Sequence, residues 1–150
     1  MFFTLPPLVL FLVSMRSRWA PLLRIRELLR DSFMPLLAGC GPLDLLLISL
    51  SAGVGEELLF RGVLQPGLSV WLGPGAGLAL ASVVFGLCHA VTVAYFVIAT
   101  LIGGYLGWLM EHSGGLLAPV VTHTAYDFVA LLYLQRELSA TRASEPAAAP

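Results

Sequence analysis

The feature that most limits how this chain can fold is a run of nearly continuous hydropathy from residue 43 to residue 136. Of the 150 residues, 58% are hydrophobic and only 11% are charged, which leaves too little polar surface to cover a soluble globule. The apolar stretches lack the alternation of a membrane β-barrel, and lipid offers no partner to an unpaired backbone group. We therefore expect an all-α protein, a polytopic bundle of transmembrane helices.

Turn residues divide the apolar run into separate helices. The turn signals are Pro66-Gly67, Gly73-Pro74-Gly75, the neighbourhood of His89, and His112-Ser113-Gly114-Gly115. They separate four apolar segments, at about 43 to 65, 75 to 90, 92 to 111 and 116 to 136. Together with a shorter apolar stretch at residues 2 to 14, these segments predict about four to five membrane helices.

The N-terminal region, residues 1–42, differs in character from the core. Five arginines lie among apolar side chains between residues 15 and 35, a pattern typical of an amphipathic helix in the membrane interface. The positive-inside rule places this helix on the cytoplasmic side. Residues 43–136 form the predicted core, and residues 137–150, rich in Ser, Ala, Thr, Glu and Pro, are predicted to be a disordered tail.

Three ionisable residues interrupt the first apolar segment of the core: Glu56, Glu57 and Arg61. A charged side chain at the centre of a bilayer costs roughly 2.5–3.5 kcal/mol, so such residues need partners or a water-filled cavity and usually mark a functional site. Glu57 and Arg61 are four residues apart, with the acid first, and are therefore predicted to form an ion pair. Glu56 points about 100° away from Glu57 on a helix, which leaves its carboxylate available for other chemistry.

Two later segments carry one histidine each with a defined neighbour. Phe85 and His89 are four residues apart, and so are His123 and Asp127. Hydrolysis needs a base that activates water and donors that stabilise an oxyanion. Glu56 is the candidate base, and His89 is placed to contact the same water. His123 and Asp127 are candidates to hydrogen-bond the tetrahedral intermediate.

Three motifs occur in order on these segments. They are Glu56-Glu57-Leu58-Leu59-Phe60-Arg61 (EExxxR), Phe85-Gly86-Leu87-Cys88-His89 (FxxxH) and His123-Thr124-Ala125-Tyr126-Asp127 (HxxxN/D). As a set, they resemble the motifs of the CPBP family of intramembrane glutamic endopeptidases, which includes type II CAAX prenyl endopeptidases and bacteriocin-processing or immunity proteins. The resemblance covers about residues 44 to 134.

The resemblance implies peptide-bond hydrolysis within the membrane by a water that is activated between Glu56 and His89. It places His123 and Asp127 on the oxyanion-binding side, at a position where the family often has Asn in place of Asp127. It also implies a multi-pass protein of the cell membrane, such as the bacterial inner membrane. The residues that would support the site are Glu57, Arg61 and Phe85.

The expected partners are a peptide or lipidated-protein substrate and the lipid bilayer. No cofactor is implied. The chain lacks a basic patch with interleaved aromatic residues, so nucleic acid is not expected as a partner. Four aromatic residues outside the motifs are expected to be interface anchors or packing groups: Trp71, Tyr95, Tyr105 and Trp108.

Other interpretations stay open from the sequence. Glu56, His89 and His123 offer three ligands to a catalytic zinc ion, although the HExxH helix of common metalloproteases is absent. A non-catalytic immunity or regulatory protein would keep the fold and use the same polar groups to join helices. Cys88 beside His89 would suit a thiol protease, yet sequence neighbours on a helix point about 100° apart. A transporter would require repeats or discontinuous helices, which the sequence does not show.

Overall fold

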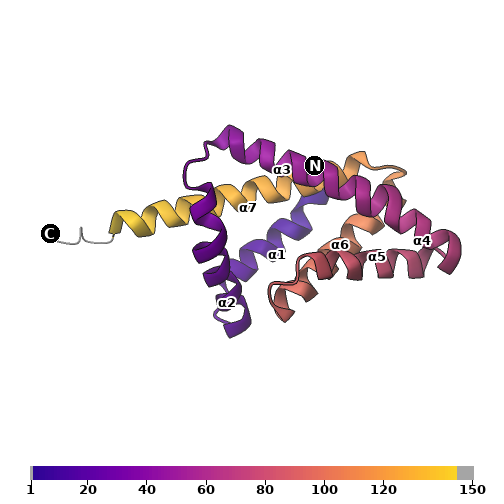
Figure 1. Cartoon of the computed structure of the whole chain (residues 1–150), viewed down its shortest axis with the longest axis horizontal. Coiled ribbons are helices and arrows are strands. Elements are labelled where there is room, and N and C mark those ends of the chain that lie inside the picture. The colour runs from indigo at the N-terminus through magenta and orange to yellow at the C-terminus, as the bar shows by residue number, and fades with distance from the viewer. Residues whose placement is uncertain (1, 145–150) are drawn as a thin grey trace.

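The computed structural model describes residues 2–144, and every regular element within them is helical (Figure 1). The α-helices are joined by short 3-10 and π-helical segments. In chain order the elements are η1 (Phe2–Thr4), α1 (Leu5–Arg16), α2 (Ala20–Leu28), η2 (Leu29–Phe33), η3 (Met34–Leu37), α3 (Pro42–Glu57), η4 (Leu58–Leu64), α4 (Gln65–Leu72), α5 (Pro74–Cys88), α6 (Val93–Ser113) and α7 (Leu117–Ser144). This arrangement confirms the all-α class that the sequence predicts.

Two helices of the described chain are long and apolar enough to cross a membrane, judged by length and composition. They are α6 and the Leu117–Glu137 part of α7, each 21 residues long. At a rise of about 1.5 Å per residue, this length matches a hydrocarbon core of about 30 Å. The apolar helices α1 and α5 are shorter, with 12 and 15 residues. The larger number of four to five membrane helices stays a prediction.

The first core segment is longer than the sequence predicts. The elements α3, η4 and α4 form one helical path over residues 42–72, so the turn predicted at Pro66-Gly67 is wrong. The π-helical turns of η4 end just before Pro66, and a proline is tolerated in the first turn of the helix that follows. The chain turns instead at Gly73, where φ is 85°, a value that glycine adopts without strain.

Glycines allow the core helices to pack closely. The helix α3 lies beside α7 along the long axis of the molecule, and α5 packs against both α4 and α6 (Figure 1). A Cβ atom added to Gly53 of α3 would collide with Thr124 of α7, and one added to Gly86 of α5 would collide with Thr100 of α6. Small residues at these crossings therefore set the distance between the helices, as they commonly do in membrane proteins.

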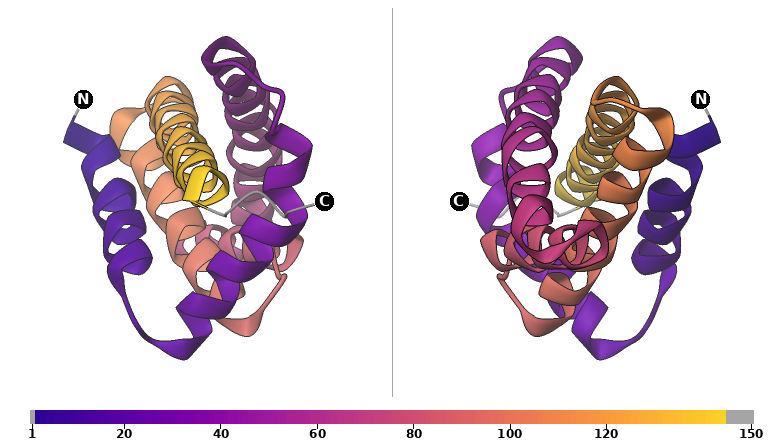
Figure 2. Two further views of the ribbon diagram at one scale, coloured as in Figure 1. Left: turned by 90° about the vertical axis from the view of Figure 1, so that its left-hand side faces the viewer. Right: turned by 90° about the vertical axis from the view of Figure 1, so that its right-hand side faces the viewer.

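The N-terminal helices pack onto α7. Phe11 of α1 contacts the rings of Tyr126 and Tyr133 edge-on, with centroids 6.2 and 5.6 Å away. The side-chain amide of Gln135 donates a hydrogen bond to the carbonyl oxygen of Leu37 at 3.1 Å, which ties η3 to the same helix. Figure 2 shows α1 on the outside of the bundle. The N-terminal region is therefore part of the folded unit.

The arginine-rich stretch forms α2 within the interval 15 to 35, where the sequence predicts a helix. Ile25 is buried and Trp19 is 62% exposed, so one apolar face of this region turns inward. Arg26 donates hydrogen bonds to the backbone carbonyls of Met15 and Ser17, at the end of α1 where carbonyls lack helical partners. The place of α2 in the membrane interface stays a prediction.

The end of α7 extends further than the sequence predicts. The predicted disordered tail begins at residue 137, but α7 continues as a helix to Ser144. Residues 137–144 contain Glu, Leu, Ala and Arg, which favour helix. The rest of the predicted tail, residues 145–150, lies outside the described residues.

Gly53→Ala should destabilise the fold, because the new methyl group would collide with the hydroxyl of Thr124 in α7 and press against its backbone nitrogen. Overpacking of this kind costs about 1–3 kcal/mol and would lower the midpoint of thermal unfolding in detergent. Gly55→Ala is the matched control, since nothing lies within 4 Å of a Cβ there and Ala favours helix over Gly. A midpoint for Gly53→Ala at or above that of the control would contradict the close α3–α7 contact.

Candidate active site

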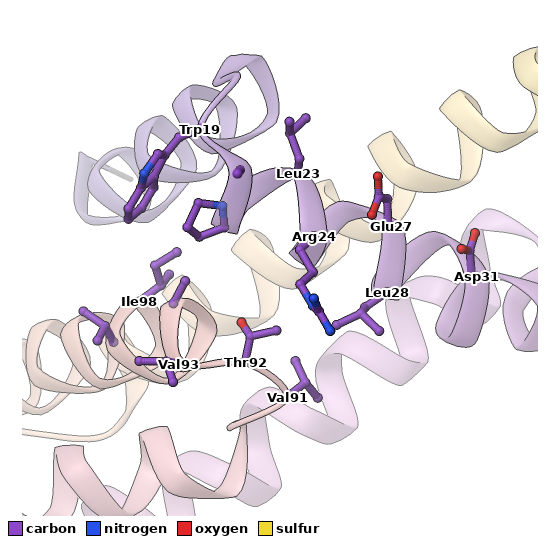
Figure 3. A pocket seen from close by; sticks show the side chains of 14 residues that line it. Trp19, Leu23, Arg24, Glu27, Leu28, Asp31, Val91, Thr92, Val93 and Ile98 are labelled. Atoms are coloured by element: carbon purple, nitrogen blue, oxygen red, sulfur yellow. The ribbon is translucent and has the colours of Figure 1, made fainter.

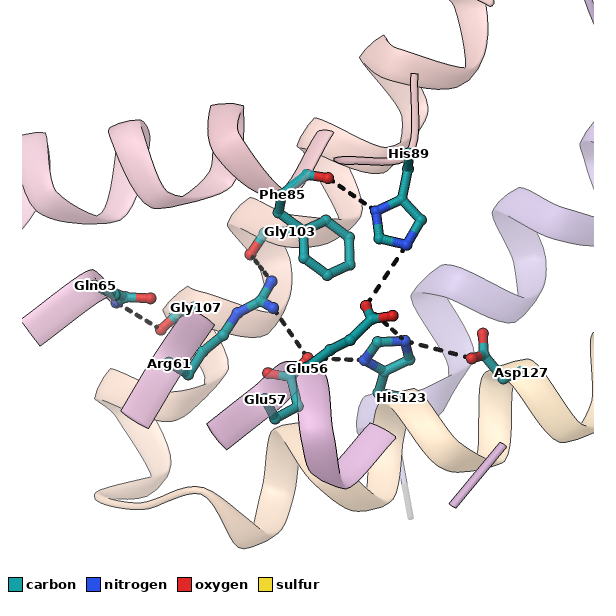
Figure 4. A network of polar contacts seen from close by, with 10 residues as sticks. All are labelled: Glu56, Glu57, Arg61, Gln65, Phe85, His89, Gly103, Gly107, His123 and Asp127. Carbon is teal, nitrogen blue, oxygen red and sulfur yellow. Dashed lines mark hydrogen bonds and ion pairs between the residues drawn. The ribbon is translucent and has the colours of Figure 1, made fainter. Parts of the chain in front are cut away.

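Three helices bring the predicted catalytic side chains together (Figure 4). Glu56 comes from the last turn of α3, His89 directly follows α5, and His123 lies in α7. The Oε2 atom of Glu56 lies 3.5 Å from Nε2 of His89 and 4.0 Å from Nε2 of His123. Residues that are far apart in the sequence thus form one polar cluster.

The carboxylate of Glu57 is fully buried and has two partners. Its Oε1 accepts a hydrogen bond from Nη1 of Arg61 at 3.0 Å, which confirms the predicted ion pair, and lies 2.8 Å from Nδ1 of His123. Arg61 also donates through Nη2 to the carbonyl oxygen of Gly103 in α6, at 2.8 Å. Its guanidinium lies 4.6 Å from the ring centroid of Phe85, a cation–π contact. These contacts compensate charges that would otherwise be costly to bury.

The orientation of His89 is set by Phe85. Nδ1 of His89 lies 2.8 Å from the carbonyl oxygen of Phe85, and the two rings stack with centroids 4.5 Å apart. A carbonyl oxygen only accepts hydrogen bonds, so Nδ1 carries the proton in this contact. In the neutral ring, Nε2 therefore has the lone pair, and this nitrogen faces Glu56. The predicted neighbour relation of Phe85 and His89 is confirmed.

Asp127 and Glu57 contact opposite nitrogens of the His123 ring. The Oδ2 atom of Asp127 lies 3.4 Å from Nε2, and Glu57 lies against Nδ1. The predicted neighbour relation of His123 and Asp127 on α7 is confirmed. The contact with Glu57 was not predicted, because the HxxxD spacing describes one helix and says nothing about α3.

Glu56 has different surroundings from Glu57. Its side chain is 32% exposed, and its Oε2 atom is buried but accepts no hydrogen bond from the described residues. Buried polar atoms without a partner are uncommon, and they are places where water or a substrate group binds. The Oε2 atom of Glu57 also accepts no hydrogen bond from the described residues, but the Glu57 side chain is fully buried. Of the two adjacent carboxylates, Glu57 is therefore closed off from the surroundings, and Glu56 is partly open to them.

Glu56 lines a cavity of about 360 Å³, a size within the range of about 300–1,000 Å³ that is usual for ligand pockets. His89, His123 and Asp127 line the same cavity. The rest of its wall is mainly apolar and comes largely from the N-terminal helices and α6, with Phe11, Met15, Leu22, Ile25, Leu29 and Ile98. The ionisable cluster thus faces an apolar space.

A second hollow, a groove of about 1180 Å³, lies between α2 and the start of α6 (Figure 3). Trp19, Leu23 and Arg24 line it on one side, with Thr92 and Val93 on the other. None of the predicted site residues lines this groove. The helix α2 therefore has the open groove on one face and the cavity with the ionisable cluster on another.

Sequence reasoning missed two polar residues near the cluster. Gln65 is buried and donates through its amide to the carbonyl oxygen of Gly107 at 3.3 Å and to Glu111 at 3.0 Å. Its position four residues after Arg61 was a usable signal, because it continues the same helical face. Tyr95, expected to be an interface anchor or packing group, lines the cavity.

The positions of the side chains bear on two alternative chemistries, a catalytic zinc ion and a catalytic thiol. In residues 2–144, no group of three or more His, Cys, Asp or Glu side chains is arranged to hold a metal ion. Cys88 is a free, exposed thiol and does not line the cavity that contains His89. The thiol of Cys88 is therefore poorly placed to act on a substrate in that cavity.

Comparison with known proteins places the chain in a family. The family model for type II CAAX prenyl endopeptidases, described as Rce1-like, matches residues 39–129, more than half of the chain. The chain belongs to this Rce1-like family. Uncharacterized protein YpbD of Bacillus subtilis (strain 168) is 31% identical over 88 residues, which cover 57% of this chain and 42% of that relative. No solved structure gives a significant match.

Arg61→Met should strongly destabilise this Rce1-like protein, because it leaves the buried Glu57 carboxylate without its guanidinium. Breaking a buried ion pair typically costs roughly 3–5 kcal/mol, which the midpoint of thermal unfolding in detergent would report. Arg30→Met is the control, since Arg30 pairs with Asp31 on the exposed surface, where such pairs contribute little. Equal shifts of the midpoint in the two variants would contradict the role given to the buried pair.

Proposed function

We propose that this Rce1-like protein is an intramembrane endopeptidase in which Glu56 and His89 activate a water molecule. The observation that carries the proposal is the distance of 3.5 Å between Oε2 of Glu56 and Nε2 of His89, both of which belong to residues lining the cavity. Both atoms accept hydrogen bonds when the carboxylate is ionised and the ring is neutral. A water that donates to both atoms presents an oxygen lone pair to a substrate in the cavity.

Hydrolysis of a peptide bond then proceeds in two steps. The water oxygen bonds to the carbonyl carbon of the substrate, Glu56 takes one water proton, and the carbonyl oxygen becomes an oxyanion. The oxyanion then re-forms the carbonyl and the carbon–nitrogen bond breaks, while Glu56 returns the proton to the leaving nitrogen. The new carboxyl group loses its remaining proton to His89 or to solvent.

The buried contacts support this mechanism by holding the site in place before a substrate binds. Glu57 is bound by Arg61 and lies against His123. Neither the carboxylate of Glu57 nor the guanidinium of Arg61 must therefore reorganise during the reaction. His123 and Asp127 line the same cavity as the proposed water. We assign them to the side that faces the substrate carbonyl, where Nε2 of His123 lies 4.0 Å from Oε2 of Glu56.

The proposed substrate is a membrane-associated or lipidated peptide. The apolar wall of the cavity supports this choice, and the description of the family names prenyl endopeptidases of the CAAX type. In such substrates the prenyl group is attached to a Cys close to the C-terminus. The apolar helices α6 and α7 support a multi-pass location in the cell membrane.

Glu56→Gln and His89→Ala should each lower the turnover of a quenched fluorescent peptide that ends in a farnesylated Cys followed by three residues. Removal of a general base or its partner reduces rates by about 10²–10⁴-fold. Cys88→Ser is the matched control, because Cys88 is adjacent to His89 but outside the cavity lining, and should keep wild-type turnover. Turnover is measured with purified protein in detergent, and the midpoint of thermal unfolding is recorded for each variant.

A parallel set of reactions contains a metal chelator and also unmodified leader-type peptides. The glutamate mechanism requires that neither the chelator nor Cys88→Ser changes the rate of cleavage. Glu56→Gln and His89→Ala must each lower that rate. Loss of turnover with chelator would assign the reaction to a metal, and loss in Cys88→Ser would assign it to the thiol. The absence of wild-type turnover on every peptide would contradict the proposal and favour a non-catalytic immunity or regulatory role.

A further inference from the structure

The proposed hydrolysis needs donors for the oxyanion, and the predicted oxyanion side supplies few. His123 presents at most one N–H to the cavity, since Nδ1 faces Glu57 and only Nε2 is left. Nε2 lies 3.4 Å from Oδ2 of Asp127, so an N–H at Nε2 already has an acceptor beside it. An oxyanion that forms next to these carboxylates therefore needs a donor from another element.

Few other polar groups of the cavity wall are free to donate. Among the described residues, the wall contains the hydroxyls of Ser14, Tyr95 and Tyr126. Ser14 already donates to the carbonyl oxygen of Phe11 at 2.6 Å, and Arg26 donates to two backbone carbonyls at the end of α1. The hydroxyls of Tyr95 and Tyr126 make no hydrogen bond to any described residue. These two phenols are therefore the available neutral donors.

Tyr95 lines the same cavity as the proposed catalytic pair, Glu56 and His89. It is in the first turn of α6, six residues after His89 along the chain. The side chain of Thr92 accepts a hydrogen bond from the backbone N–H of Tyr95 at 3.1 Å, which caps the helix and fixes its first turn. The Tyr95 side chain interacts electrostatically with the carboxylates of Asp127 and Glu56. It is thus near the open carboxylate and on a rigid helix.

Tyr126 is less well placed, although it lines the same cavity. Its side chain interacts electrostatically with Tyr95 and Asp127, and its ring packs edge-on against Phe11 in the N-terminal wall. We propose that the hydroxyl of Tyr95 donates a hydrogen bond to the oxyanion of the tetrahedral intermediate, an inference that rests on the hydrolysis proposed above. Tyr95 is then a catalytic residue, and Tyr126 belongs to the substrate wall.

The chemistry of a phenol suits this position. A neutral O–H donor brings no positive charge into an apolar cavity, and it strengthens its hydrogen bond as negative charge develops on the carbonyl oxygen. The hydroxyl of Tyr95 has no hydrogen bond to a described residue that it would give up when the oxyanion forms. Its contribution is therefore larger in the transition state than in the complex with bound substrate, which raises kcat without tighter substrate binding.

The test compares Tyr95→Phe with Tyr126→Phe in the full chain, using the farnesylated quenched peptide. Each substitution removes one hydroxyl and keeps the ring. Tyr95→Phe should lower kcat by about 10²–10³-fold, as loss of one oxyanion donor typically does, with little change in KM. Tyr126→Phe should keep a kcat close to that of the wild type. A farnesylated peptide phosphinate, which mimics the charged intermediate, should bind more weakly to Tyr95→Phe by a similar factor.

The possible outcomes separate this inference from the proposed function. If the wild type cleaves the peptide and Tyr95→Phe cleaves it equally fast, the role of Tyr95 is overturned while the hydrolysis stands. A rise in KM alone, or a fall in kcat that tracks a lower unfolding midpoint, would make Tyr95 a packing residue and also overturns the inference. If the wild type cleaves no peptide, both the proposed function and the role of Tyr95 are wrong.

Discussion

The arrangement of the core helices depends on the contacts of the buried Glu57 carboxylate. It accepts a hydrogen bond from Arg61 and lies against His123, and Arg61 continues the link to the backbone of Gly103. A charge in such an apolar interior is tolerated only with partners of good geometry, so α3, α6 and α7 are held in the arrangement that supplies them. The direction of the next residue, Glu56, is fixed as a consequence. Its open carboxylate oxygen can then contact His89, which directly follows a fourth helix, α5.

The ionisable cluster and part of the apolar wall come from different parts of the chain. The family match over residues 39–129 contains the whole cluster that we propose as catalytic. The helices α1 and α2 precede this range and supply Phe11, Leu22 and Ile25 to the cavity wall. Under the proposed function, changes in the N-terminal helices would therefore alter which peptide fits, while the proposed chemistry would depend on the matched core. The groove on the other face of α2 places this helix between the surroundings and the cavity.

Helical spacing predicted contacts within one helix and missed those between helices. Glu57 and Arg61 pair because they are four residues apart, which the sequence shows directly. The contact of His123 with Glu57 joins residues 66 positions apart, and no local pattern specifies it. The helix passes through Pro66 because of the π-helical turns before it, which composition does not reveal. Tyr95 was expected to be an interface anchor or packing group, because an amphipathic ring suits both the membrane interface and a protein interior. That it lines a cavity depends on the packing of the N-terminal helices, which the sequence does not show.

In the proposed mechanism, water attacks the peptide bond directly between Glu56 and His89, and no covalent link forms between protein and substrate. The most direct test is cleavage of the farnesylated peptide in ¹⁸O-labelled water with added hydroxylamine, followed by mass spectrometry of the product that carries the new C-terminus. Direct attack predicts a free acid with one oxygen-18 atom and no hydroxamate, because no acyl-enzyme is formed. A hydroxamate product would show that an acyl group was held on the protein, as a thiol nucleophile would hold it, and would contradict this account.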